Sequence, residues 1–463
     1  MNNILKRIFT IVIATMILTQ CVACSHQAGN LPPVIANLTK AEKKNYATLA
    51  SQNTERAQKI AQGVEDTYII GRRGDTLFVG MYVNTSTGRP RDTVSVWHLT
   101  SMLSMTSKLW SIHTGEQANH YKSLYGEILS TMDYYKGTGL ITDYNSTKEQ
   151  TMYAVNRATI KGTASLEGVS AVYDDQMWII RELLYVYQMT KNESYLEQAK
   201  QLTQTCLDAW DNSVVEGEEV GGITWGPGYF SKHTCSTGPL IVALVDLYEI
   251  TQTEVYLTWA KKIYDWTKKQ FQMESGVYGD NAKSWRGEEG EGEEKHYFST
   301  TNMVDPDMTA YTYNVGTMIS GGAALYKVTG EETYLEDAKH SAKGTYDVFA
   351  KATQVDGKTL YQYAPTRDNL YNGPVWFNLI LLEGYLELFP YDENCKAYID
   401  VFQTSLDYAY ENYQKENGFL PRDLLLGWNM NQGKDQEKDI MDQAAYAEIY
   451  AQLAEFYAYL AER

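Results

Sequence analysis

The chain has 463 residues, of which 44% are hydrophobic and 21% are charged, and it contains only ten prolines. This composition is typical of a globular protein with long helices and excludes an intrinsically disordered chain. The formal net charge of −18 excludes a protein that attracts nucleic acid or an anionic membrane surface by charge.

The N-terminus has the features of an export signal. Two basic residues precede the apolar run Ile8–Leu18, which is too short to span a bilayer. Cys24 follows a small alanine, and this resembles the lipobox of bacterial lipoproteins. We expect residues 1–24 to be a signal peptide ending at the lipidated cysteine, 25–40 a tether, and 41–463 a single catalytic domain. The lipid would anchor the protein to a membrane of a bacterial cell envelope, at the outer membrane, facing the periplasm or the surface.

An internal repeat organises the remaining chain. The pattern aliphatic-Tyr-x-x-Thr-x-x-x-x-Tyr-Leu occurs three times, with its first tyrosine at Tyr187, Tyr248 and Tyr326. An apolar helical segment precedes each copy and a more polar, amphipathic one follows it. Each copy is therefore predicted to be the turn between an inner and an outer helix, with the threonine placed to cap.

Six segments have the character of inner helices. They begin near Trp97, Asp174, Ser236, Asn314, Pro374 and Ile440. With six outer helices they predict an all-α fold, an (α/α)6 toroid with few short strands. In such a ring, the loops that enter the inner helices line a central cleft, where we expect the functional site.

Regions outside the helices carry weaker signals. The best strand candidates are Leu77–Val83 and Leu360–Tyr363. The acidic segment from Arg286 to Lys295 is predicted to be a solvated loop between the third and fourth hairpins. Three cysteines follow the N-terminal region, an odd number without metal-ligand spacing, so no disulfide framework is expected.

Asp174 and Asp175 stand at the predicted start of the second inner helix. Glycosidic cleavage needs a protonated acid on the leaving oxygen and a second carboxylate as nucleophile or base. The helix dipole favours an ionised carboxylate at this position, and repulsion between two close carboxyls raises the pKa of one of them. We expect the two carboxyl groups to lie about 5 Å apart, the separation of a retaining enzyme. For an isolated Asp-Asp pair, the favoured explanation is that one aspartate caps the helix and its neighbour is solvated.

Three segments together resemble glycoside hydrolase family 76, the endo-α-1,6-mannanases: VYDDQMWIIRELLYVYQMT, GGITW followed by KHTCSTGP, and TYNVGTMISGGAALYKVTG. The resemblance runs from about Trp97 to the C-terminus. In that family, the first of the tandem aspartates is the nucleophile and the second is the acid/base. The resemblance therefore implies that Asp174 forms the covalent mannosyl-enzyme intermediate and that Asp175 protonates the departing oxygen and then activates water. This chemistry needs no metal and no cofactor.

The resemblance also implies positions that contact sugar. The glycine-aromatic loop of the family maps onto Gly221, Gly222 and Trp225, and its Tyr-Asn-Gln-Gly element maps onto Tyr313 and Asn314 with the two residues that follow. Further candidates are aromatic or polar side chains in predicted cleft segments, which can stack on a sugar face or bond its hydroxyls: Trp97, His98, Tyr229, Tyr311 and Trp428.

The sequence departs from the family pattern at four positions. These are Thr224, where an aromatic is common, His233 and Thr237, where asparagines are common, and Val315, where glutamine is common. Lost amides mean lost hydrogen bonds to sugar hydroxyls, which favours a change in sugar or linkage specificity.

The favoured interpretation is a retaining, endo-acting glycoside hydrolase that cleaves α-1,6-linked mannan by double displacement. Its partner would be a polysaccharide or oligosaccharide, with no nucleic acid and no membrane contact beyond the lipid anchor. One alternative is another sugar-active enzyme on the same toroid, since one fold hosts many chemistries. The other is a lipid-anchored glycan-binding protein without turnover.

Overall fold

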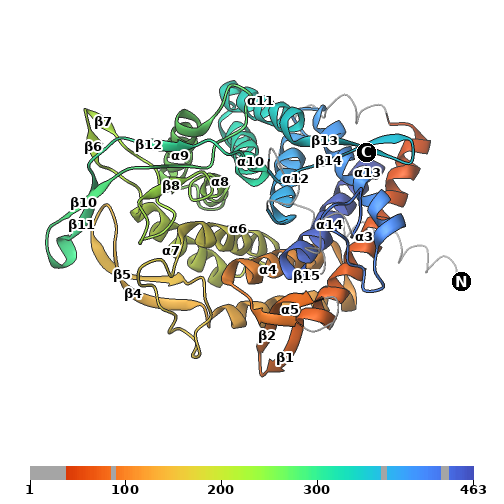
Figure 1. Cartoon of the computed structure of the whole chain (residues 1–463), viewed down its shortest axis with the longest axis horizontal. Coiled ribbons are helices and arrows are strands. Elements are labelled where there is room, and N and C mark those ends of the chain that lie inside the picture. Colours follow the sequence, from red (N-terminus) through yellow and green to blue (C-terminus); the bar gives the residue numbers. More distant parts are fainter. Residues whose placement is uncertain (1–37, 85–89, 367–372, 429–436) are drawn as a thin grey trace, which may run out of the picture.

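The computed structural model describes residues 38–84, 90–366, 373–428 and 437–463 (Figure 1). The predicted signal peptide, the predicted lipidation site Cys24 and nearly all of the predicted tether lie outside these ranges. Twelve α-helices dominate the described part of the chain and its strands are short, which confirms the all-α class. Within these ranges, none of the helices combines the length and the apolar character that a membrane span requires.

The six predicted inner segments all begin helices. These are α4 (Val96–Ile112), α6 (Tyr173–Thr190), α8 (Gly238–Thr251), α10 (Thr312–Thr329), α12 (Trp376–Leu388) and α14 (Ile440–Glu462). Each of them contacts the next one along the chain, and α14 contacts α4, so the contacts among the six helices form a closed cycle (Figure 1). Their N-terminal ends therefore bring six loops into one neighbourhood.

Five inner helices are followed by an outer partner. These partners are α5 (Gly115–Met132), α7 (Glu193–Asp208), α9 (Glu254–Phe271), α11 (Glu332–Phe349) and α13 (Cys395–Tyr413). The sixth partner, α3 (Lys40–Tyr68), comes from the start of the described chain and packs along α14 (Figure 1). Thr39 and Glu42 form a capping box at its N-terminus, so the helix begins one residue before the predicted domain start. Pairing the first and last helices closes the cycle of hairpins.

The repeat threonines Thr190, Thr251 and Thr329 lie at the predicted turns but have a different role. Each donates its hydroxyl to the carbonyl four residues earlier, at 2.6–2.7 Å. Each is the last residue of an inner helix, and the residue after it has a left-handed φ of 55°, 55° and 71°, respectively. The expectation that threonine caps the outer helix was wrong, because other residues occupy those N-cap positions.

The short strands of the described ranges are all antiparallel and lie in the segments that connect the helices. They are β1 (Ile69–Arg73), β2 (Thr76–Asn84), β3 (Pro90–Thr93), β4 (Lys136–Thr142), β5 (Thr147–Tyr153), β6 (Val214–Val215), β7 (Glu218–Glu219), β8 (Ser231–His233), β9 (Asn281–Lys283), β10 (Arg286–Glu289), β11 (His296–Ser299), β12 (Val304–Asp307), β13 (Ala350–Val355), β14 (Lys358–Tyr363) and β15 (Glu437–Asp439). The sheets are β1-β2-β15 with β3 on β2, β12-β9-β8, and the hairpins β4–β5, β6–β7, β10–β11 and β13–β14.

Both predicted strands are confirmed, since they fall inside β2 and β14. The acidic segment does lie between the third and fourth helical hairpins, but it is not a loop. It forms strand β10, the short 3-10 helix Gly292–Glu294 and the start of the β10–β11 hairpin. Cross-strand pairing, which a run of glutamates does not reveal, orders this segment. The described cysteines Cys206, Cys235 and Cys395 are buried and free, as the absence of a disulfide framework predicts.

Polar side chains of neighbouring inner helices bond to one another inside the cycle. Glu182 of α6 accepts a hydrogen bond from Ser107 at 2.8 Å, and Glu448 of α14 accepts one from Ser104 at 2.7 Å. Arg181 donates to Glu383 of α12 at 3.0 Å. Glu182 lies seven residues after Asp175 along α6, which is about 10 Å of helix. These buried polar contacts therefore lie further along the inner helices than the helix start that carries the aspartates.

Close packing between α10 and α12 depends on glycine. A Cβ on Gly316 would lie 2.5 Å from the carbonyl oxygen of Ile380, and a Cβ on Gly384 would lie 2.8 Å from the carbonyl oxygen of Gly316. Both contacts are with backbone atoms, which cannot move aside without shifting a helix. The two helices could not approach this closely with any side chain at these positions.

Gly316→Ala should therefore destabilise the fold by about 1–3 kcal/mol, because overpacking forces the backbone to shift. Gly126→Ala is the matched control. Gly126 is exposed on α5 with nothing near its missing Cβ, so alanine should stabilise the protein by about 0.5–1 kcal/mol through helix propensity. Urea unfolding followed by circular dichroism measures both. Equal stability of the two variants would contradict the assignment of this close contact.

Candidate active site

Asp174 and Asp175 lie in the first turn of α6, whose N-cap Val172 provides no side-chain hydrogen bond. The predicted position of the pair at the start of the second inner helix is confirmed. Asp175 is 7% exposed, while Asp174 is half-buried. Neither carboxylate caps the helix. The backbone N–H bonded to Asp174 is that of the next residue, Asp175, whereas a capping side chain bonds an N–H two or three residues later.

Both oxygens of Asp174 accept hydrogen bonds. Trp225 Nε1 donates to Oδ2 at 3.1 Å, and the backbone N–H of Asp175 donates to Oδ1 at 2.9 Å. The Trp225 carbonyl accepts from the backbone N–H of Tyr173 at 2.7 Å, and its N–H donates to the Ser231 carbonyl at 2.9 Å. The backbone of Trp225 is therefore bonded to the residue that precedes the aspartates, and its indole N–H lies at the Asp174 carboxylate.

Asp175 has a different environment. Within the described ranges, its carboxyl group has no hydrogen-bond or ion-pair partner. Burial raises its pKa well above the ordinary value, and the charge of Asp174 raises it further. The pKa of Asp174 is also raised, to about 6, because burial outweighs the hydrogen bonds from Trp225, from the Asp175 backbone and from Cys235, which lower it. Of the two adjacent groups, Asp174 thus keeps the negative charge and Asp175 keeps the proton.

Aromatic rings at the starts of α4, α6, α10 and α12 form a connected cluster. Tyr313 stacks on Phe377 with ring centroids 4.1 Å apart, and Tyr311 meets Phe377 edge-on at 5.7 Å. Trp97 meets Trp376 edge-on at 5.5 Å. Trp376 in turn contacts Trp178, one turn after the aspartates on α6, at 4.6 Å. The predicted residues from α4 and from the start of α10 are therefore brought together.

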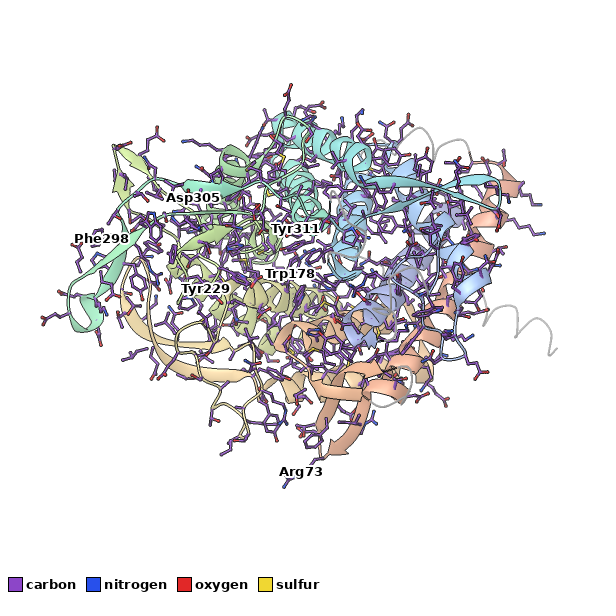
Figure 2. The ribbon with its side chains drawn as sticks, viewed as in Figure 1. Arg73, Trp178, Tyr229, Phe298, Asp305 and Tyr311 are labelled. Atoms are coloured by element: carbon purple, nitrogen blue, oxygen red, sulfur yellow. The ribbon has the colours of Figure 1, made fainter. Side chains whose placement is uncertain are left out.

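Figure 2 labels Trp178 and Tyr311 near the middle of the view and Tyr229 to their left. Trp376 and Phe377, which link the predicted rings, were not singled out from the sequence. The available signal was a Trp-Phe pair at the start of the fifth inner segment. The indole N–H of Trp97 is buried without a hydrogen-bond partner in the described part of the chain.

A polar group lies beside Trp225. The His233 ring is 5.1 Å from the Trp225 ring, and its Nδ1 is 3.8 Å from Asp280 Oδ2. Asn314 Nδ2 donates to Asp280 Oδ1 at 3.1 Å, while Asn314 Oδ1 is buried and has no partner among the described residues. Asp280 was missed from the sequence. It lies directly before β9, whose pairing with β8 brings it to His233.

His98 is held by protein partners at the start of α4. Ser95 Oγ lies 2.7 Å from its Nδ1, and Asp439 Oδ1 lies 3.5 Å from its Nε2. Trp428 donates its indole N–H to the Tyr413 carbonyl at 2.6 Å. A sugar-contacting role for these two residues stays a prediction.

Gly221 and Gly222 have left-handed φ values of 70° and 80°. A Cβ at either position would lie within 2.4 Å of the Trp266 ring on α9. Their observed contacts are therefore with an outer helix, and their predicted influence on sugar binding stays a prediction.

Three of the four departures from the family pattern make purely internal contacts. The Thr224 hydroxyl donates to the Gly226 carbonyl at 3.1 Å, and the Thr237 hydroxyl donates to the His233 carbonyl. Val315 is fully buried in the core. His233 is thus the departure that lies among the polar groups beside Trp225.

A model of glycosyl hydrolase family 76 matches residues 55–458, most of the sequence. The chain belongs to glycosyl hydrolase family 76. This membership confirms the resemblance seen in the sequence and places the chain among the glycoside hydrolases. The known members of the family are therefore relatives with which the site can be compared.

Among curated proteins, the chain is similar to the mannan endo-1,6-alpha-mannosidases DCW1 of Candida glabrata and of Saccharomyces cerevisiae. It is 28% identical to the first over 147 residues, which cover 31% of this chain and 29% of that protein. It is 28% identical to the second over 145 residues, covering 30% of this chain and 28% of that protein. The matched region spans less than a third of these relatives.

Solved structures of family 76 cover far more of the chain. The mannosidase Bt3792 from Bacteroides thetaiotaomicron matches with a TM-score of 0.67 and 25% identity, over 87% of this chain and 98% of that one. An inactive variant of the α-1,6-mannanase GH76A of Salegentibacter sp., solved with α-1,6-mannotetrose, matches with a TM-score of 0.62 and 20% identity, over 87% and 99%. The latter comparison supports the fold.

Trp225→Phe tests the hydrogen bond from Trp225 to Asp174, which lowers the pKa of Asp174 relative to that of Asp175. Losing the donor should raise the pKa of Asp174, so the acidic limb of the pH–activity profile should move to higher pH. Activity at the optimum should fall by about 10- to 100-fold, the range for a hydrogen bond to a charged group.

Tyr229→Phe is the matched control for this prediction. The Tyr229 ring packs on Trp225 at 4.8 Å, but no hydrogen bond from Tyr229 to Asp174 is present. Its acidic limb should stay where the wild-type limb lies. A profile for Trp225→Phe that also coincides with the wild type would contradict the role assigned to the indole N–H.

Proposed function

We propose that this family 76 protein is a retaining, endo-acting α-1,6-mannanase, with Asp174 as nucleophile and Asp175 as acid/base. The observation that carries the proposal is the difference between the two adjacent carboxyl groups. One accepts hydrogen bonds on both oxygens, and the other is buried without a partner in the described chain. Double displacement requires this division, since one group must be ionised and the other protonated at the same pH.

In the first step, an ionised Asp174 oxygen attacks the anomeric carbon while the glycosidic bond breaks. Asp175 gives its proton to the departing sugar oxygen. Once Asp174 is esterified, its charge is lost and the pKa of Asp175 falls. Asp175 then takes a proton from water, and the resulting hydroxide attacks the anomeric carbon and releases Asp174. Two inversions leave the product with the configuration of the substrate.

The solved relatives support the proposed residues and substrate. The Salegentibacter structures with α-1,6-mannotetrose and α-1,6-mannotriose are of inactive variants in which two consecutive aspartates are replaced. Asp174 and Asp175 are likewise consecutive and lie at a helix start in this chain. The curated relatives are mannan endo-1,6-alpha-mannosidases, which supports internal cleavage of the same linkage.

We also propose that the cycle of inner helices, each with an outer partner, forms an (α/α)6 toroid. The six loops at the N-terminal ends of the inner helices would then line one cleft with the aspartates at its centre. Export through residues 1–24 and lipid attachment at Cys24 remain part of the proposal. They would hold the enzyme at the cell envelope, where polysaccharide is available.

Another sugar or linkage is the second candidate. The observation that favours it is the replacement of a common asparagine by His233, which reaches toward Asp280 and packs on Trp225. An imidazole offers fewer hydrogen bonds than an amide, so a site built around it would favour a different set of sugar hydroxyls. A glycan-binding protein without turnover would have no need of two carboxyl groups in different protonation states.

The proposal is tested by digesting unbranched α-1,6-mannan with the soluble domain and following product anomers by proton NMR. Wild type should release α-configured oligosaccharides of several lengths. Asp175→Ala should reduce the rate by about 10²–10⁴, the usual contribution of a general acid. Asp174→Asn should abolish turnover because no nucleophile remains.

An aryl α-mannooligosaccharide separates the two roles, because its leaving group needs no proton. Azide should restore turnover of Asp175→Ala on this substrate and give an α-mannosyl azide, while Asp174→Asn should give none. Release of β-configured products by wild type would contradict retention. Wild type that binds α-1,6-mannan without cleaving it would favour the binding-protein alternative.

A further inference from the structure

Two large aromatic rings are exposed next to the candidate active site. Phe230 is 36% exposed and Trp285 is 49% exposed. The rings stack on each other with centroids 4.9 Å apart and planes at 24°. Single exposed apolar residues are common on protein surfaces, but a stacked exposed pair, here called the aromatic platform, is a candidate binding surface.

The aromatic platform is continuous with the candidate active site. Phe230 directly follows Tyr229, whose ring lies 4.8 Å from the Trp225 ring. Trp225 donates the hydrogen bond to Asp174. The segment that begins at Trp225 and ends at Phe230 therefore leads from the proposed nucleophile to the platform. A chain bound at Asp174 that extends along this segment would meet the two rings.

The backbone on both sides of the platform is fixed. The Ser284 N–H donates to the Phe230 carbonyl at 3.3 Å, and the Thr300 N–H donates to the Trp285 carbonyl at 2.6 Å. The Trp285 N–H donates to Thr301 Oγ1 at 3.0 Å. Trp285 is thus attached both to the loop of Phe230 and to the segment that follows β11.

Arg286, the first residue of β10, bonds the acidic β10–β11 hairpin to the segment Trp225–Phe230, here called the active-site loop. Its guanidinium donates to the Tyr229 carbonyl at 2.7 Å and to the Pro227 carbonyl at 3.1 Å, and it lies 3.7 Å from the centre of the Tyr297 ring. A planar guanidinium with two fixed acceptors and a ring below it loses little freedom on bonding. The β10–β11 hairpin thereby holds Trp285 against Phe230.

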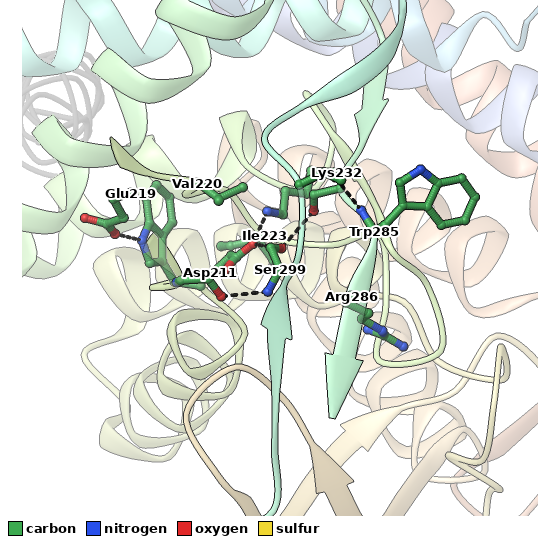
Figure 3. Close-up of polar contacts among 12 residues, drawn as sticks. Asp211, Glu219, Val220, Ile223, Lys232, Trp285, Arg286 and Ser299 are labelled. Carbon is green, nitrogen blue, oxygen red and sulfur yellow. Dashed lines mark hydrogen bonds and ion pairs between the residues drawn. The ribbon is translucent and has the colours of Figure 1, made fainter. Parts of the chain in front are cut away.

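A buried ion pair connects the strand that follows Phe230 to the β10–β11 hairpin. Lys232 of β8 and Asp211 are both completely buried and bond to each other, and Ser299 of β11 donates its hydroxyl to Asp211 (Figure 3). Figure 3 shows this group beside Trp285 and Arg286. Removing either charged partner would leave an uncompensated buried charge. The platform is therefore pre-organised, which lowers the entropy lost when a ligand binds.

We propose that Phe230 and Trp285 form a distal subsite for the polysaccharide substrate, beyond the sugars that contact Asp174 and Asp175. The apolar C–H face of a pyranose ring would lie on the exposed aromatic surface. The adjacent acidic hairpin would disfavour anionic polysaccharides, so the ligand is a neutral chain. The identity of the sugar, α-1,6-linked mannose, rests on the proposed function. The subsite makes the enzyme select long chains over short ones.

Binding is tested in the inactive Asp174→Asn background, using isothermal titration calorimetry with α-1,6-mannooligosaccharides of increasing length. Affinity should rise with length until the platform is reached. Trp285→Ala and Phe230→Ala should each remove that last gain, about tenfold for a lost aromatic contact, and leave the affinity for the shortest ligands unchanged. Trp285→Phe should keep most of the gain because it keeps a ring.

Hydrolysis is measured separately with the active enzyme. Trp285→Ala should raise KM for the polymer about tenfold with kcat unchanged, since the lost contact is made equally in the ground and transition states. Ile70→Ala is the matched control, because Ile70 is 61% exposed on β1, at the lower edge of the molecule in Figure 1 and away from the β10–β11 hairpin at the left. Its KM should equal that of the wild type.

Two outcomes would overturn the proposal. If Trp285→Ala matches its parent at every ligand length, the platform is not a subsite, and the proposed function stands on the hydrolysis data alone. If the parent binds none of the ligands and the wild type cleaves no α-1,6-mannan, both proposals fail. Equal melting temperatures for the variants and their parents ensure that a lost affinity is not a folding defect.

Discussion

Two carboxyl groups on consecutive residues repel each other once they are buried, and in this chain their surroundings decide which of them holds the proton. Trp225 and the helix backbone give hydrogen bonds to Asp174, while Asp175 receives none from the described chain. A charge-assisted hydrogen bond in a buried site is worth more than one in water. This difference depends on the position of Trp225, whose backbone is bonded to Tyr173 and Ser231.

The closed cycle of helices explains how the side chains of the site are brought together. An inner helix contributes its first turn, and the loop before the next inner helix contributes the side chain that touches it. Asp174 comes from α6, and Trp225 comes from the segment before α8. His233 and Asp280 are brought together by the β8–β9 pairing. Polar side chains inside the cycle bond to one another further along these helices.

The repeat predicted much of this from the sequence alone. It predicted the starts of the inner helices, and the resemblance to family 76 then singled out Asp174 and Asp175 at one of those starts. It did not reveal that the sixth outer helix comes from the N-terminus, because α3 carries no copy of the pattern. The same local signal was misleading for the repeat threonines, whose hydroxyls bond within the inner helix.

Features that depend on contacts far apart in the sequence could not be predicted. Asp280 carries no motif, and only the pairing of two three-residue strands brings it to His233. Gly221 and Gly222 matched a sugar-binding loop by position, but their backbone packs on Trp266 of an outer helix. The exposed pair of Phe230 and Trp285 forms only because the β10–β11 hairpin, a run of acidic residues in the sequence, folds back on the active-site loop.

The most direct test of this account is to trap the covalent intermediate. An Asp175→Ala enzyme mixed with an aryl α-mannooligosaccharide should accumulate the glycosyl-enzyme, since no base remains to activate water. Protease digestion and tandem mass spectrometry should then find the sugar esterified to Asp174. A sugar attached to another residue, or turnover without any labelled peptide under single-turnover conditions, would contradict the assignment of Asp174 as the charged, attacking member of the pair.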